Sequence, residues 1–93
     1  MAIPFYTPGP LRQYTEGRSH VEVKVSAATV AEALAALWQA YPGLRDRVLT
    51  EQGEVRQHVN IFVGEENIRD CGGFDAPVKN GTTITIMPAV SGG

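Results

Sequence analysis

The chain has 93 residues, of which 43% are hydrophobic and 19% charged, and it carries a formal net charge of −2 at pH 7. This size and composition are those of one globular domain, and the scattering of eight basic residues among ten acidic ones argues against nucleic acid as the main partner. No apolar stretch approaches the ~20 residues that a membrane-spanning helix needs, the first residues lack the pattern of a signal peptide, and the single cysteine cannot form an intrachain disulfide, so we expect a cytoplasmic protein without a membrane partner.

Two strand-like segments open the chain. Residues 3–7 are rich in strand formers, and prolines at positions 4, 8 and 10 predict an edge or irregular strand that resumes at residues 11–14. A turn at residues 15–18 leads to residues 19–25, where polar and apolar side chains alternate and valines point toward a core. We predict an N-terminal β-hairpin.

One clear helix follows the hairpin. Thr29 and Glu32 have the spacing of a capping box, in which each side chain satisfies a free backbone N–H of the other residue. The next apolar side chains share one helical face; they are Val30, Leu34, Leu37, Trp38 and Tyr41. Pro42 and Gly43 are expected to end this helix, and residues 44–49 to add a short helical turn.

Three extended segments complete the predicted sheet. They are residues 55–63, a very short piece at residues 68–69 and a final strand at residues 82–87, which follows an Asn-Gly turn signal. The alternation predicts that Phe62 and Met87 lie on the face opposite to the helix. The side chains expected toward the helix are Val55, Gln57, Val59, Ile61, Val63, Ile84 and Ile86.

The chain closes with a short uncharged tail. Proline has no N–H to give to a sheet, so strand pairing is expected to stop at Pro88. This predicts a folded domain over residues 1–87 and a flexible tail over residues 88–93. Gly92 and Gly93 can adopt nearly any backbone conformation and pass through a narrow channel. From Met87 onward the extended chain reaches roughly 23–25 Å.

The predicted order is hairpin, helix, strand, short strand and final strand. It indicates an α+β fold in which one main helix covers one face of a mixed four- to five-stranded sheet. This is the order of the β-grasp, or ubiquitin-like, fold, whose first and last strands usually pair in parallel at the sheet centre. The sequence alone leaves that pairing open.

The order of elements, the length and the tail together resemble the MoaD/ThiS family of ubiquitin-like sulfur carriers. The most specific part is residues 78–93, which read Val-Lys-Asn-Gly, a Thr/Ile strand and Pro-Ala-Val-Ser-Gly-Gly. Residues 59–63 and the turn after them also resemble the family's middle strand. The segment 43–54 and the ending look most like carriers that serve cysteine biosynthesis, while molybdopterin carriers more often end in Pro-Pro-Val-Ala-Gly-Gly.

The resemblance implies a protein substrate and sulfur donor, not an enzyme. A ubiquitin-activating-type adenylyltransferase would use ATP to adenylate Gly93, and a sulfur source would convert it to a thiocarboxylate, with Gly92 giving clearance. The acceptor would be a cysteine synthase or the large subunit of molybdopterin synthase, and a metal-dependent isopeptidase is a further implied partner. The carrier itself would bind no cofactor, and the two histidines, on separate strands, lack the spacing of metal ligands.

Phe62 and Met87 are the candidate partner contacts in the folded part of the chain. Exposed apolar groups on a polar face can mark a partner site, although the same two side chains could form a cluster covered by a loop. Arg56 and Arg69 would rim such a patch or be solvated. The tail completes the candidate partner-binding set with Pro88, Ala89, Val90 and Ser91.

Three further interpretations complete the predictions. A ubiquitin-like modifier joined to lysines through Gly93 would use the same activation, so the tail does not separate it from a sulfur carrier. A β-grasp binding module with an incidental tail is the third function. Cys71 is expected to be a partly buried small residue in a glycine-rich loop and not a reactive thiol.

Overall fold

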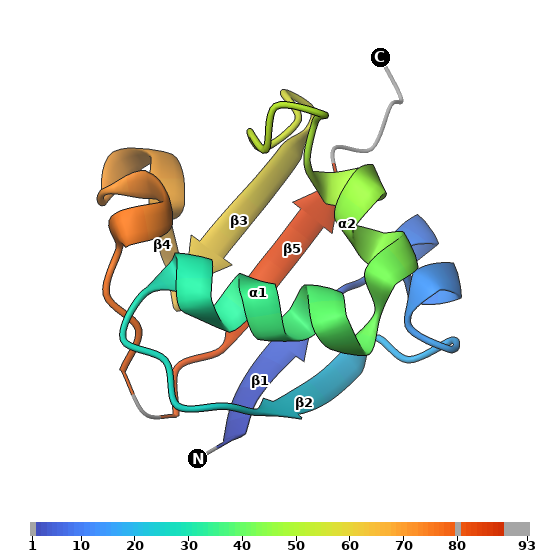
Figure 1. Ribbon diagram of the computed structural model, residues 1–93, viewed down its shortest axis with the longest axis horizontal. Helices are drawn as coiled ribbons and strands as arrows, with labels where there is room; N and C mark the ends of the chain where they lie inside the picture. The colour runs from blue at the N-terminus through green and yellow to red at the C-terminus, as the bar shows by residue number, and fades with distance from the viewer. Residues whose placement is uncertain (1, 80, 89–93) are drawn as a thin grey trace.

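The computed structural model describes residues 2–79 and 81–88. Within these residues one five-stranded sheet lies behind two α-helices, and three short 3-10 segments lie at its ends (Figure 1). The strands are β1 (Ala2–Tyr6), β2 (His20–Lys24), β3 (Val59–Val63), β4 (Glu66–Asn67) and β5 (Ile84–Pro88). The helices are α1 (Val30–Ala40) and α2 (Pro42–Val48), and the 3-10 segments are η1 (Gly9–Tyr14), η2 (Ile68–Asp70) and η3 (Gly73–Asp75).

The sheet has the strand order β2-β1-β5-β3-β4, so the strand that leads into the C-terminal tail lies at its centre. β1 and β5 pair in parallel, with Phe5 opposite Ile84 and Tyr6 opposite Thr85. The other neighbours pair antiparallel. This is the mixed sheet of a β-grasp fold, and the predicted fold class is confirmed.

The predicted capping box starts α1. The Thr29 hydroxyl accepts a hydrogen bond from the Glu32 N–H at 3.3 Å, and the Glu32 carboxylate accepts one from the Thr29 N–H at 3.2 Å. The buried face of α1 packs on the sheet through Val30, Ala33, Leu34 and Leu37. The cap therefore sets where the helix begins over the sheet, and the apolar spacing sets which face it buries.

The second helix differs from the prediction. α1 ends at Ala40, as Pro42 and Gly43 predicted, but Pro42 then occupies the first turn of α2, where its missing N–H would have no partner in any case. Leu44 and Val48 bury α2 against the same core. The expected single turn at residues 44–49 is thus a helix of two turns that extends the layer over the sheet.

Three predicted strand segments take other forms. Residues 11–14 do not resume β1: they belong to η1, whose first turn holds Pro10 and whose Leu11 is 5% exposed. β3 starts at Val59, not at residue 55, because its partner β5 ends opposite Val59. Val55 instead forms an isolated bridge to Leu49. The short strand β4 lies just before residues 68–69, which are in η2.

β5 runs one residue further than predicted. Pro88 is the last residue of the strand and lies opposite Val59. Proline lacks only the N–H, so it keeps the extended geometry and register of a final ladder position. Pro88 therefore belongs to the sheet. No helix in the described ranges is long and apolar enough to cross a bilayer.

Candidate functional site

The end of β5 is the part of the fold that presents the C-terminal tail. Ile84 and Ile86 are fully buried toward the helices, while the alternate residue Met87 is 39% exposed on the other face. β5 ends at the upper end of the sheet in Figure 1. Its last residue, Pro88, is half-buried and lies opposite Val59 at the start of β3. The other predicted tail residues lie outside the described residues; they are Ala89, Val90, Ser91, Gly92 and Gly93.

The sheet face away from α1, here called the outer face, carries the predicted partner contacts. The strand registers bring one residue from each strand into a row across it: His20, Tyr6, Thr85, Phe62 and Asn67. Phe62 is half-buried and belongs neither to the core nor to the side chains packed against it. Met87 is one row nearer the tail, opposite Asn60. The predicted orientation of Phe62 and Met87 is confirmed.

Tyr6 extends this surface and was missed from the sequence. Its ring stacks on that of His20, with centroids 4.7 Å apart and an angle of 25° between the planes. Like Phe62, it is half-buried without contributing to the core. The alternation of β1, in which Ile3 and Phe5 are buried, could have placed Tyr6 on the outer face.

Polar side chains at the β3–β4 corner border this surface. The Arg69 guanidinium donates to the Asn60 carboxamide oxygen at 2.7 Å and to the Arg56 carbonyl at 3.1 Å. The Asn67 carboxamide donates to the same Asn60 oxygen at 3.1 Å. Since Asn60 is opposite Met87, Arg69 is held at the rim of the outer face, close to the end of β5.

Arg56 has a different environment. Its guanidinium donates twice to the backbone carbonyl of Asp46, at 2.8 and 3.0 Å, and so lies against α2. Of the two arginines predicted to rim the patch, only Arg69 is fixed to an outer-face side chain.

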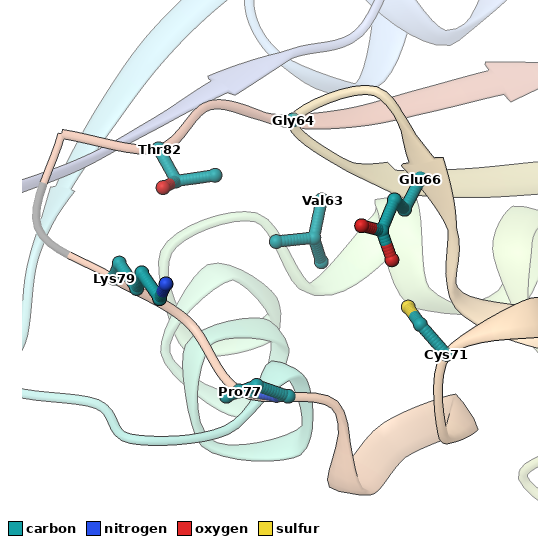
Figure 2. A pocket seen from close by; sticks show the side chains of 7 residues that line it. All are labelled: Val63, Gly64, Glu66, Cys71, Pro77, Lys79 and Thr82. Carbon is teal, nitrogen blue, oxygen red and sulfur yellow. The ribbon is translucent and has the colours of Figure 1, made fainter.

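A cavity of about 410 Å³ opens at the other end of the sheet. Figure 2 shows the Glu66 carboxylate and the Cys71 thiol pointing toward each other on one side and Lys79 on the other. Its lining includes Gly64, which follows β3, and Thr82, which precedes β5. It therefore lies at the start of β5, away from the strand end that leads to Gly93.

Cys71 in this cavity is half-buried, as predicted. Desolvation first, and then the charges of Glu66 and Asp70, raise the pKa of the thiol above its ordinary value. Only the thiolate is a strong nucleophile, so these surroundings oppose reaction at neutral pH. Within residues 2–79 and 81–88 no three His, Cys, Asp or Glu side chains gather in a way that could hold a metal ion.

Comparison with known proteins decides between the families that share this fold. The model of the ThiS family matches residues 7–93, nearly the whole chain including the tail. The chain belongs to the ThiS family. As a ThiS-family protein it is a sulfur carrier, a class of protein substrates that are not themselves catalysts.

Three relatives describe its place in the ThiS family. The sulfur carrier protein CysO of Mycobacterium tuberculosis is 32% identical over 95 residues, which cover 100% of both chains. A chain in the crystal structure of the Amycolatopsis orientalis BexX/CysO complex superposes with a TM-score of 0.86 at 36% identity, covering 98% of this chain and 99% of that one. SAMP1 of Haloferax volcanii superposes with a TM-score of 0.84 at 30% identity over the full length of both chains.

Proposed function

We propose that this ThiS-family protein carries sulfur as a C-terminal thiocarboxylate on Gly93 and donates it in cysteine biosynthesis. The observation that carries the proposal is the similarity to Mycobacterium tuberculosis CysO along the full length of both chains. The position of β5 supports it, because the central strand ends at Pro88 and five residues, ending in Gly92-Gly93, follow it.

The chemistry requires activation of the terminal carboxylate. An α-carboxyl group has a pKa of about 3.3–3.7, so at neutral pH it is an anion and a poor electrophile. In the proposed first step a carboxylate oxygen of Gly93 attacks the α-phosphorus of ATP and pyrophosphate leaves. Sulfide then attacks the acyl carbon, AMP leaves with its electron pair, and the thiocarboxylate remains.

The protein's own residues would supply reach, clearance and recognition. Residues 89–93 span roughly 17 Å when extended, enough to bring Gly93 into a partner's active site. Gly92 offers no Cβ to the walls of a narrow channel. Phe62, Met87 and Pro88 would contact a ubiquitin-activating-type adenylyltransferase, followed along the tail by Ala89, Val90 and Ser91. The crystal structure of a BexX/CysO complex supports the expectation that such carriers form complexes with a partner protein.

The proposed sulfur acceptor is a cysteine synthase. The large subunit of molybdopterin synthase is the alternative acceptor, since molybdopterin carriers have a similar length and ending. A metal-dependent isopeptidase would release the tail after transfer to an amino acid. The carrier binds no cofactor in this scheme, and ATP is used by the activating enzyme.

Conjugation to lysine side chains is the second candidate function. It is favoured by the similarity to small archaeal modifier protein 1 of Haloferax volcanii, 35% identical over 78 residues. Because conjugation and sulfur transfer share the adenylation step, the products alone distinguish them.

The first experiment follows the terminal carboxylate by intact mass spectrometry. The carrier is incubated with ATP, sulfide and its adenylyltransferase, and its mass is expected to rise by the exchange of one oxygen for one sulfur. A variant lacking Gly93 keeps all of β5 and serves as the control that should gain nothing. An unchanged mass of the complete chain would contradict the proposal.

The thiocarboxylated carrier then identifies the acceptor. With a pyridoxal-phosphate cysteine synthase and an activated serine we expect a covalent carrier–cysteine adduct, and hydrolysis of its acyl bond by the isopeptidase should release one cysteine for each thiocarboxylate. Sulfur transfer only to a molybdopterin precursor on the synthase large subunit would move the protein to that pathway. Isopeptides between Gly93 and lysines in a cell digest would favour the modifier.

A further inference from the structure

The β3–β4 corner separates its charges between two faces. The Glu66 carboxylate lines the cavity and points toward the Cys71 thiol (Figure 2), and the charge of Asp70 acts on the same thiol. Arg69, between them in sequence, turns the other way and hydrogen-bonds to Asn60 on the outer face. A protein with a net charge of −2 thus presents a cation beside the exit of its tail.

This cation is held in place by neutral groups. The Asn60 oxygen and the Arg56 carbonyl accept from the two terminal nitrogens of Arg69, and the Asn67 oxygen accepts from its backbone N–H at 3.0 Å. In the described part of the chain the one ion pair joins Arg45 and Asp46. The Arg69 charge therefore has no carboxylate partner there, and three of its five N–H donors are left for another molecule.

The position of Arg69 relates it to the apolar surface. Asn60 lies directly opposite Met87 on the neighbouring strand, and Met87 is exposed. A fixed guanidinium at the edge of an exposed apolar side chain is the arrangement of a protein interface, in which a charged rim surrounds an apolar contact. Preordering also reduces the entropy that such a side chain loses on binding.

We propose that Arg69 is the electrostatic anchor of the outer face: it pairs with a carboxylate of the adenylyltransferase while Met87 and Phe62 make the apolar contact. This inference rests on the proposed function, because it names the partner surface of the same carrier. It commits to an acidic partner surface and explains why two uncharged groups, the Asn60 side chain and the Arg56 carbonyl, hold the guanidinium in place of a carboxylate.

The experiment measures how well variants of the carrier serve the adenylyltransferase in ATP–pyrophosphate exchange. Arg69→Gln is expected to raise the KM for the carrier about tenfold with little change in kcat, as is typical for the loss of one interfacial charge pair. Arg69→Lys keeps the positive charge but lacks the planar set of N–H donors of a guanidinium. Its KM should stay close to the wild-type value. The effect of Arg69→Gln should shrink when the salt is raised from about 0.1 M to about 1 M, because the Debye length falls from about 10 to about 3 Å.

Arg56→Gln is the matched control. It removes the same charge and a similar set of hydrogen bonds, but its guanidinium lies against α2, so its KM should stay near the wild-type value. Thermal unfolding of each variant distinguishes a loss of partner binding from a loss of stability at the β3–β4 corner.

The outcomes are distinct. Equal KM values for Arg69→Gln and Arg56→Gln would overturn the inference. The inference would also be overturned if Arg69→Gln and Arg69→Lys raised the KM equally and lowered the melting temperature in parallel. The role of Arg69 would then be structural. Absence of exchange with the unmodified carrier would overturn the proposed function first, and this inference with it.

Discussion

At Cys71 the surroundings of the thiol oppose its ionisation. The half-buried side chain loses solvation, and the nearby carboxylates Glu66 and Asp70 repel a thiolate. Both effects raise the pKa of the thiol, so the reactive form becomes abundant only above the ordinary value of 9.0. The only cysteine of this sulfur carrier is thus held in a form that reacts poorly at neutral pH.

Alkylation of Cys71 by iodoacetamide tests this environment. The rate is expected to rise with pH through a midpoint above 9.0. Glu66→Gln removes one negative charge, lowers the pKa of Cys71 and should speed alkylation at neutral pH by about two- to fivefold. Glu65→Gln is the control, since Glu65 is exposed and makes no contribution to the thiol pKa. Equal rates for the two variants would contradict the assignment.

Single residues were predictable where strand alternation decides their face. The orientation of Phe62 and Met87 follows from that rule, and Tyr6 would have followed from it as well. The fixed position of Arg69 could not be predicted, because it depends on the Asn60 oxygen, nine residues away in sequence.

β5 has two faces with separate tasks. Its helix side is fully buried and its outer side is exposed at Met87. Ile86 and Met87 are adjacent in sequence, so substitutions at these two positions should affect different properties. One face contributes to the stability of the domain, and the other is available to a partner.

A pair of alanine substitutions separates these properties. Ile86→Ala leaves a cavity in the core and is expected to lower the free energy of unfolding by about 2–5 kcal/mol. Met87→Ala should change it by less than about 0.5 kcal/mol and raise the KM of the carrier for its adenylyltransferase. Urea titration and pyrophosphate exchange measure the two effects, with the exposed Thr83→Ala as control. A large loss of stability in Met87→Ala would contradict this division.

Element boundaries were harder to predict than element types. The capping box located the start of α1, because it is a local interaction between Thr29 and Glu32. The start of β3 was misplaced by four residues because a strand ends where its partner ends, and β5 stops opposite Val59. Arg56 binds the carbonyls of α2 instead, its N–H donating to Val48 at 3.0 Å.

At the scale of the whole molecule, one core joins the two ends of the chain. β1 and β5 are central neighbours, and the helices pack on the face that they share. The parallel pairing of β1 with β5 could not be predicted from the sequence alone, because no local pattern links residues so far apart. It followed only from the resemblance to a known fold.

This arrangement predicts all-or-none unfolding. Fluorescence of Trp38, which packs against the core from α1, and far-UV circular dichroism should give coincident urea transitions, with a slope of about 1 kcal/mol/M for a domain of this size. Two separate transitions would contradict a single core. A variant truncated before Ile84 should show no cooperative transition, since it lacks the central strand.

The parallel ladder also determines how the molecule responds to tension. The start of β1 and the end of β5 lie at opposite ends of the sheet (Figure 1). If a partner binds the outer face and pulls on the chain beyond Pro88, the force therefore acts along β5. β5 lies between β1 and β3, so its hydrogen bonds to both strands are stretched at the same time by a force along the strand. They would not break one after another. The carrier can thus be held by its body and pulled by its terminus without losing the strand that connects the two.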